Sequence, residues 1–283
     1  MIAFNCDYNE GAHPRILEAL IETNMEQTAG YGGDQYCREA EIIIKGLCQS
    51  PEAKVHFMVG GTQANLTVIS SVLRPHQAAL CAVSGHINVH ETGAIEACGH
   101  KVMTVPSEDG KISALHKNDS SFEHTTQPKL VYISNPTELG TIYTKKEVEE
   151  LRAACDECGM YLYLDGARLG YGLCAENNDL DLESIAKNCD VFYIGGTKVG
   201  ALFGELPDRG QGAADGELVD LLPQGAHPIQ HLQGLHRQGQ RVRRLAHRHG
   251  LAVPGDEGHA QLPLQQLQVG IRHPEQVLHG QHV

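Results

Sequence analysis

Residue usage changes abruptly near residue 205 of this 283-residue chain, and the change limits which part can form a packed core. All nine cysteines lie before residue 206, as do every lysine, methionine and aromatic residue. Residues 206–283 also lack Ser, Thr and Asn, yet they hold 9 of the 17 histidines. Because a core needs aromatic or large aliphatic side chains at regular spacing, we predict one folded domain over residues 1–205 and an anomalous tail over residues 206–283.

The composition of the tail has two explanations. Apart from Ile229 and Ile271, every residue type in it has a codon that begins with G or C. A GC-rich gene read in a shifted frame, or from the opposite strand, produces this bias because the wobble base moves to the first codon position. A His- and Gln-rich disordered segment is the alternative, although such segments are typically rich in Ser, Lys and Thr. We favour the frame error and expect the tail to be disordered or non-native.

Charge and hydropathy exclude several classes of partner. A net charge of −13 offers no basic field to phosphates, so we expect neither a nucleic-acid nor an anionic-membrane partner. No run of about 18 apolar residues is present, so no membrane span is expected. The first residues do not resemble a secretory signal, and we therefore expect a cytoplasmic protein with reduced cysteines.

One pair of cysteines has a spacing that metal sites also use. Cys155 and Cys158 fall on the apolar side of an expected helix, and no second pair follows at zinc-site spacing. We therefore expect no metal site.

Short apolar runs alternate with helical patterns through the first 205 residues. The strands are expected at residues 55–59, 79–83, 101–105, 130–133, 161–164 and 191–194. The helices are expected at residues 62–73, 87–98 and 145–158. This alternation predicts an α/β fold with a mostly parallel sheet and crossover helices. In such sheets ligands bind beyond the carboxyl ends of the strands.

Gly60, Gly61 and Thr62 follow an expected strand and begin an expected helix. Glycines let backbone N–H groups approach an anion, the helix N-terminus adds partial positive charge, and Thr62 can donate a hydroxyl. By itself this pattern is more typical of a plain strand–helix turn than of a phosphate site.

Asp165 and Arg168 follow the apolar run at residues 161–164. A carboxylate at a strand end can hold the pyridine nitrogen of pyridoxal phosphate protonated. The guanidinium of Arg168 suits a carboxylate or phosphate because it can donate two parallel hydrogen bonds. An Asp that caps a helix, with an Arg on the surface, is an equally good interpretation of these two residues alone.

Lys198 follows Gly195, Gly196 and Thr197 at the end of the last expected strand. Alone, such a lysine is typically solvated. An anion loop, a pyridine carboxylate and a lysine in this order favour a Schiff-base lysine in a pyridoxal-phosphate site.

Seven segments in order resemble the threonine aldolase family. They are DYNEGAHPRIL (7–17), GYGGDQYC (30–37), GGTQAN (60–65), SGHINVHETGAIEACGHKV (84–102), SNPTELGTIYT (134–144), LDGARLGYGL (164–173) and FYIGGTKVGALFGE (192–205). The resemblance covers residues 2–205 only. It implies the large domain of the aspartate-aminotransferase-like (fold type I) pyridoxal-phosphate enzymes, and the family's C-terminal small domain is not recognisable.

The resemblance also implies roles for individual residues. The matches are Gly61 and Thr62 in the phosphate loop, His86 stacked on the cofactor ring, Asp165 at the pyridine nitrogen, Arg168 beside the cofactor or substrate carboxylate, Thr197 beside the cofactor, Lys198 as the covalent attachment point, and Cys6 and Tyr36 near the substrate. His86 could instead cap the helix that follows, and Tyr36 could be a core residue. Many members have a serine at the position of Cys6, and a thiol is a weaker hydrogen-bonding group.

The implied reaction is cleavage of threonine or allo-threonine to glycine and an aldehyde, with His86 or a water that it orients as the base. A homo-oligomer is implied if the complete domain is present. Nothing after Glu205 resembles the small domain, whose arginine holds the substrate carboxylate, so we expect this chain to be impaired. The alternatives are a β-eliminating lyase or aminotransferase of the same fold, and a non-catalytic cofactor-binding fragment.

Overall fold

A six-stranded sheet forms the centre of the computed structural model, which describes residues 6–114 and 124–202 and the backbone of residues 205–208. The rest of the predicted tail lies outside the described residues. The strands are β1 (Gln77–Ala82), β2 (Lys101–Val105), β3 (Gln127–Ser134), β4 (Tyr161–Asp165), β5 (Val191–Gly195) and β6 (Glu205–Asp208). Their order across the sheet is β2-β1-β3-β4-β5-β6. All neighbours are parallel except β5 and β6, which confirms the predicted α/β class.

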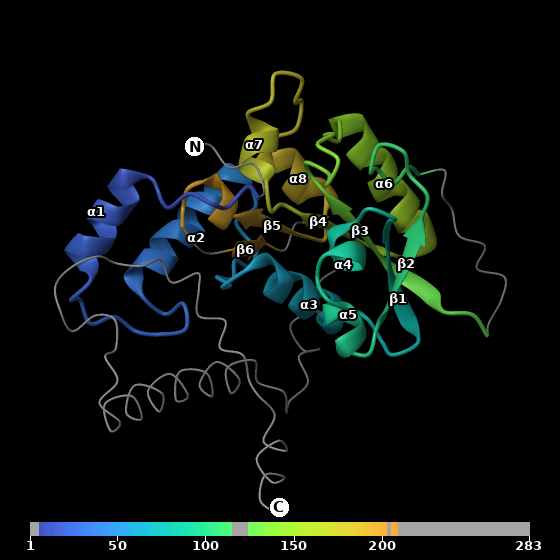
Figure 1. Cartoon of the computed structure of the whole chain (residues 1–283), viewed down its shortest axis with the longest axis horizontal. Coiled ribbons are helices and arrows are strands. Elements are labelled where there is room, and N and C mark those ends of the chain that lie inside the picture. Colours follow the sequence, from blue (N-terminus) through green and yellow to red (C-terminus); the bar gives the residue numbers. More distant parts are fainter. Residues whose placement is uncertain (1–5, 115–123, 203–204, 209–283) are drawn as a thin grey trace, which may run out of the picture. The chain divides into compact units, whose positions relative to one another are not determined.

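Helices cover both faces of this sheet (Figure 1). One face carries α3 (Gly61–Val72), α4 (His86–Val89) and α5 (Ala94–Ala97), and the other carries α6 (Lys145–Cys158), α7 (Leu169–Leu173) and α8 (Leu182–Asn188). The helices α1 (Pro14–Thr23) and α2 (Gln35–Leu47) precede the sheet in sequence, and the 3-10 turn η1 (Thr197–Val199) follows β5. None of the described helices is long and apolar enough to cross a membrane.

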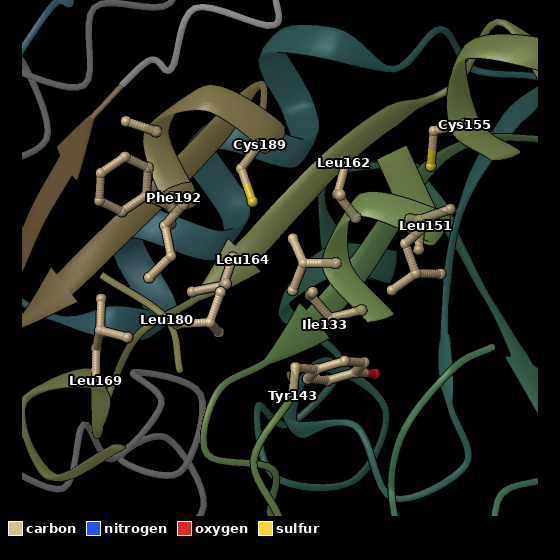
Figure 2. Packing of buried hydrophobic residues seen from close by; sticks show 14 of the residues in the cluster. Ile133, Tyr143, Leu151, Cys155, Leu162, Leu164, Leu169, Leu180, Cys189 and Phe192 are labelled. Atoms are coloured by element: carbon tan, nitrogen blue, oxygen red, sulfur yellow. The ribbon is translucent and has the colours of Figure 1, made fainter. Parts of the chain in front are cut away.

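The alternation of side chains along each strand divides the core into two clusters. Figure 2 shows the cluster on the α6 side, where aliphatic strand residues such as Ile133, Leu162 and Leu164 meet Leu151 and Cys155 of α6. The cluster on the α3 side differs because it contains three fully buried tyrosines, Tyr132, Tyr163 and Tyr193. Their hydroxyls need partners in the interior, and they find them at the carboxyl ends of the strands.

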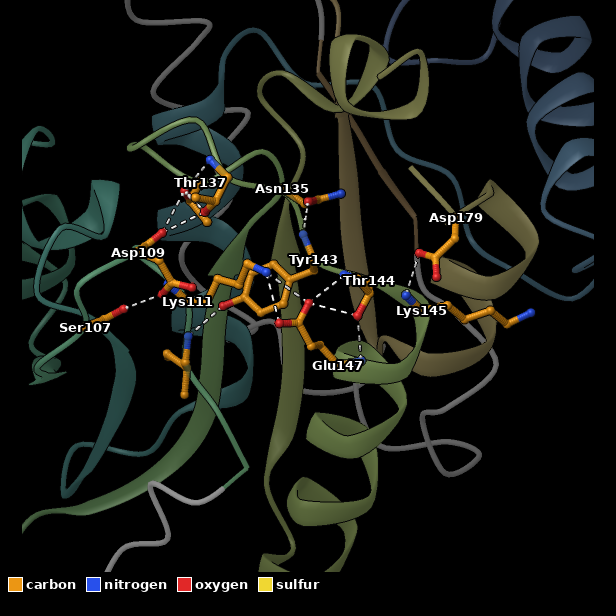
Figure 3. Close-up of polar contacts among 12 residues, drawn as sticks. Ser107, Asp109, Lys111, Asn135, Thr137, Tyr143, Thr144, Lys145, Glu147 and Asp179 are labelled. Atoms are coloured by element: carbon orange, nitrogen blue, oxygen red, sulfur yellow. Dashed lines mark hydrogen bonds and ion pairs between the residues drawn. The ribbon is translucent and has the colours of Figure 1, made fainter. Parts of the chain in front are cut away.

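A polar network fixes the loop that follows β3 (Figure 3). The Asn135 side chain accepts a hydrogen bond from the Tyr143 N–H at 3.0 Å, and the Tyr143 hydroxyl accepts one from the Ile112 N–H at 2.7 Å. Thr144 and Glu147 form a capping box at the start of α6. The Glu147 carboxylate also binds Lys111 Nζ at 2.9 Å. These contacts join the loop after β2 to the loop after β3 and so hold the second loop in place.

The sequence predicted five of the six strands and the helices α3 and α6, whereas α1, α2, α7, α8 and β6 were not predicted. The predicted helix at residues 145–158 has the observed bounds of α6, and five of the six predicted strands correspond to β1 to β5. The strand predicted at residues 55–59 was wrong, because only Val55 and Met58 form isolated bridges and Phe57 and Val59 are exposed. An apolar run forms a strand only where a neighbour pairs along its length.

The single helix predicted at residues 87–98 was also wrong. The chain forms two short helices, α4 and α5, because Thr92 and Gly93 both have positive φ angles, 55° and 71°. Left-handed residues end a right-handed helix. This break decides the direction of the Glu91 side chain.

The contact between Asp190 and Arg152 provides a test of the packing between α6 and the sheet. The buried Asp190 carboxylate accepts hydrogen bonds from Arg152 Nη1 at 2.5 Å and from the Leu162 N–H at 2.6 Å. We predict that Asp190→Ala lowers the free energy of unfolding by about 2–3 kcal/mol, because the partly buried Arg152 guanidinium loses one of its acceptors and the Leu162 N–H also loses an acceptor. Urea denaturation measures the change.

The matched control is Glu150→Ala. It removes a carboxylate of α6 that lies 3.7 Å from Lys146 Nζ at the protein surface. We expect it to change the free energy by less than about 0.5 kcal/mol. Equal effects of the two substitutions would contradict the structural role of Asp190.

Candidate active site

Three of the predicted site residues lie at the carboxyl edge of the sheet, together with Glu138, which was not predicted. His86 follows β1, Glu138 follows β3, Asp165 ends β4 and Lys198 follows β5. The strand order reverses between β1 and β3, since β2 lies on one side of β1 and all later strands lie on the other. Such a reversal opens a crevice where α/β sheets bind ligands. The backbone N–H of His86 donates to Glu138 Oε1 across this point at 2.9 Å.

Asp165 is a deeply buried carboxylate of this edge, with 3% of its surface exposed. Its Oδ1 accepts hydrogen bonds from the Ala167 N–H at 2.9 Å and the Tyr193 hydroxyl at 2.5 Å. Its Oδ2 accepts from Asn65 Nδ2 at 3.1 Å and from the Tyr132 hydroxyl. Four donors saturate an ionised carboxylate, which makes its burial tolerable.

The alternative interpretation of Asp165, as the cap of the following helix, does not hold. The N-cap of α7 is Arg168 and makes no side-chain cap, so Asp165 does not cap that helix. The chain turns sharply after Asp165 because Gly166 lies against β5, where a Cβ atom would come within 1.9 Å of the Tyr193 carbonyl oxygen. Only glycine fits there.

His86 lies beside a carboxylate that the sequence analysis did not single out. His86 Nδ1 is 2.7 Å from Glu91 Oε1, and the Glu91 side chain is fully buried. The hydrogen bond to Glu91 raises the pKa of His86, burial opposes it, and the charges of Asp165 and Lys198 act in opposite directions. Asp165 and Lys198 are therefore both within electrostatic reach of His86. His86 is the first residue of α4 and makes no cap.

Asn65 joins this pair to Asp165. Its Nδ2 donates to Glu91 Oε1 at 2.6 Å as well as to Asp165 Oδ2, and its Oδ1 accepts from the Tyr163 hydroxyl at 2.8 Å. Asn65 and Glu91 both fall within segments of family resemblance, but no local pattern indicates that their side chains turn inward. The contact between them spans 26 residues of sequence.

Lys198 and Arg168 both face the N-terminal segment. Arg168 forms an ion pair with Asp7 through Nε and Nη2, and Lys198 Nζ lies 3.9 Å from Asp7 Oδ1. Burial alone would raise the pKa of Asp7, but the hydrogen bond from Arg168 and the charge of Lys198 outweigh it and lower the pKa. Lys198 Nζ also lies 5.8 Å from the centre of the Tyr8 ring. No local sequence pattern indicates that Asp7 pairs with Arg168.

The remaining predicted residues take different positions. Gly61 is the first residue of α3 and Thr62 is exposed beside it, while Thr197 begins η1 next to Lys198. The Cys6 thiol donates to Asn9 Oδ1 at 2.7 Å, one residue from Asp7. Tyr36 lies on α2, is 41% exposed and donates to Glu26 at 2.6 Å. It is therefore not a core residue, and its contacts lie on the α1 side, where it lines a hollow with Ile16 and Leu20.

The donor set of this edge suits pyridoxal phosphate. It offers a buried carboxylate, an imidazole and an amine, and the first N–H groups of the twelve-residue helix α3 have no partner within that helix. Four donors already form hydrogen bonds with Asp165, so a pyridinium N–H would have to replace one of them. Among the described residues, no group of three His, Cys, Asp or Glu side chains could hold a metal ion.

Comparisons with known proteins agree with this geometry. The family model of the beta-eliminating lyases matches residues 7–202, well over half of the chain. A low specificity L-threonine aldolase of Pseudomonas aeruginosa is 30% identical over 209 residues, which are 71% of this chain and 60% of that protein. The chain thus spans about 60% of the length of this curated relative.

Solved structures show the same relationship. A Leishmania major threonine aldolase matches with a TM-score of 0.72 and 50% sequence identity, over 77% of this chain and 65% of that one. An aspartate aminotransferase of Thermus thermophilus shares the fold, with a TM-score of 0.58 and 19% identity over 75% of this chain and 56% of that one. The predicted fold type I architecture and the predicted resemblance to threonine aldolases are both confirmed. The chain belongs to the beta-eliminating lyase family.

Proposed function

We propose that the complete protein is a pyridoxal-phosphate-dependent lyase that cleaves threonine or allo-threonine to glycine and acetaldehyde. The observation that carries the proposal is the convergence of His86, Asp165 and Lys198 at one edge of the sheet, where Asp165 and Lys198 both lie within electrostatic reach of His86. The 50% identity to a threonine aldolase structure supports the substrate class. We further propose that the protein acts in the cytoplasm as a homo-oligomer.

Each residue of the site would have a distinct task. Pyridoxal phosphate, when bound, supplies the sink for the electrons of the Cα–Cβ bond. Asp165 would hold the pyridine nitrogen protonated, because a buried carboxylate favours a cation beside it. The N-terminus of α3, with Gly61 and Thr62, would bind the phosphate. Lys198 would carry the cofactor covalently.

His86 would accept the proton of the substrate β-hydroxyl, directly or through a water. A base works best when its pKa lies near the working pH, and the carboxylate of Glu91 raises the pKa of His86 toward that range. Arg168 is the candidate for the substrate carboxylate. A substrate would have to share this guanidinium with Asp7, which already uses Nε and Nη2.

We propose that the chain with residues 206–283 as they stand is a slow enzyme. That stretch has no aromatic residue and resembles no second domain. Loss of the bidentate contact that the family's small domain would add to that of Arg168 at the substrate carboxylate costs roughly 1.5–3 kcal/mol, or about one to two decades in rate. Identification of the products, and not the rate, is therefore the decisive measurement.

We predict that the cofactor-loaded chain, incubated with threonine or allo-threonine, releases glycine and acetaldehyde in equal amounts. Amino-acid analysis and aldehyde trapping measure both products. A keto acid with ammonia would identify a β-eliminating lyase instead, and a transferred amine would identify an aminotransferase. Bound cofactor without any product would indicate a non-catalytic fragment.

We predict that borohydride reduction of the cofactor-loaded protein attaches the cofactor to Lys198, which peptide mapping identifies. Lys198→Arg should abolish the label, because a guanidinium does not form this linkage. The control Lys187→Arg changes an exposed lysine of α8 and should leave the label in place. A label on another lysine would overturn the assignment of the site.

We predict that Asp165→Asn lowers the rate of glycine formation by about 10- to 100-fold, because a neutral amide cannot hold the pyridine nitrogen protonated. The loss in cofactor affinity should be much smaller, since the contacts at α3 remain. Steady-state kinetics and cofactor titration give the two quantities. Asp179→Asn, remote from the site and bound to the Lys145 N–H, is the control. Equal, modest losses in both quantities would make Asp165 a structural residue.

A further inference from the structure

We propose that Glu91 is a positioning residue, which holds His86 as the Nδ1–H tautomer and thereby makes Nε2 the atom that accepts the substrate proton. The second half of this inference rests on the proposed function, whereas the first half concerns the free protein alone. Glu91 contacts His86 directly, whereas it is linked to Asp165 only through Asn65, so we assign its main influence on the reaction to His86.

The contact itself determines which ring nitrogen carries a proton. His86 Nδ1 and Glu91 Oε1 are 2.7 Å apart, which is the length of a charge-assisted hydrogen bond. An ionised carboxylate only accepts hydrogen bonds, so Nδ1 must be the donor. In the neutral imidazole the lone pair then lies on Nε2. About 30% of the His86 side chain remains exposed, whereas the Glu91 side chain has no exposed surface.

The backbone directs Glu91 into the interior. Glu91 is the last residue before Thr92 and Gly93, whose positive φ angles separate α4 from α5. A β-branched residue in the left-handed region is uncommon and costs free energy. The strained turn brings a carboxylate five residues after His86 back to the His86 ring, which a continuous helix would not do at this spacing.

The Glu91 carboxylate is part of a polar network that Asn65 extends to Asp165. One amide nitrogen, Nδ2, donates one hydrogen to Glu91 Oε1 and the other to Asp165 Oδ2. The opposite amide orientation would place an oxygen against two carboxylates, so the network itself defines the orientation. The second carboxylate oxygen, Glu91 Oε2, is buried and has no hydrogen-bond partner. Burying a carboxylate without full compensation is costly, and a purely structural role would be served better by an amide or an apolar residue.

Several charged groups surround His86. Glu91 and the ring of His90, 5.3 Å away, come from the segment that contains His86 itself. The loop after β3 contributes Glu138, which accepts the backbone N–H of His86, while β4 contributes Asp165 and η1 contributes Lys198. The Glu91 carboxylate stabilises the imidazolium, so its removal should lower the pKa of His86.

The first test uses the apoprotein of the full chain labelled with ¹⁵N. Long-range proton–nitrogen correlation spectra, with His86 assigned through its own backbone amide, report the tautomer and the pKa. We expect a protonated, pyrrole-like Nδ1 and a pyridine-like Nε2 above the pKa, which should exceed the ordinary value for histidine. The opposite tautomer, or rapid exchange between the two, would overturn the proposal without any substitution.

The second test compares three variants. Glu91→Gln should lower the pKa of His86 by about one unit or more and release the tautomer preference. Glu91→Asp keeps the charge and should retain most of the pKa increase. Glu96→Gln removes an exposed carboxylate of α5 and should change the pKa by much less. A pKa that is insensitive to Glu91→Gln would refute the positioning role.

The pH dependence of glycine formation separates the two halves of the inference. In Glu91→Gln the acidic limb of kcat/KM should move to lower pH by the same amount as the His86 pKa in the spectra. If Glu91→Gln lowers the His86 pKa in the spectra but leaves the acidic limb of kcat/KM unchanged, Glu91 does act on His86, but His86 is not the base. If glycine is not formed at all, the proposed function fails, while the tautomer and pKa measurements still decide the role of Glu91.

Discussion

The burial of one carboxylate, that of Asp165, is the constraint on which the arrangement of this domain depends. A charge with 3% of its surface exposed is tolerable only if surrounding groups donate to it. The donors come from α3, β3, β5 and the turn after β4. Satisfying Asp165 therefore requires the sheet, its α3 face and the turn at Gly166 to be in place together.

The three buried tyrosines serve this constraint. Tyr132, Tyr163 and Tyr193 lie on β3, β4 and β5 and belong to the core cluster on the α3 side. Their hydroxyls reach Asp165 and Asn65 at the strand ends. The apolar rings fill the core and the polar tips supply hydrogen bonds, so a single set of side chains stabilises the sheet and prepares its edge for a charged ligand.

Charges of both signs meet at that edge in an ordered way. Glu91, Glu138 and Asp165 lie on the side of α3 and α4, where they surround His86, while Lys198 and Arg168 face Asp7 of the N-terminal segment. The hydrogen bond with Glu91 raises the pKa of the His86 imidazole. Lys198 and Arg168 instead lie beside the carboxylate of Asp7. A site that must bind a phosphate, a pyridinium and an amino-acid carboxylate needs both kinds of group within a few ångströms.

The sequence by itself determined the class of the fold and the order of the strands along the chain, and it supplied the prediction of the main site residues. These follow from local causes: apolar period and length define strands and helices, and parallel strands bring their carboxyl ends to one edge. The same reasoning predicted Asp165 and Lys198 at one edge of the sheet, whereas His86 was predicted only from the resemblance to threonine aldolases. Only the tertiary structure decided that Thr92 and Gly93 break a helix and turn Glu91 inward, that Asn65 joins two carboxylates 26 and 100 residues away, and that Asp7 pairs with Arg168 across 161 residues. Such contacts depend on strand register and side-chain packing, which a local pattern does not specify.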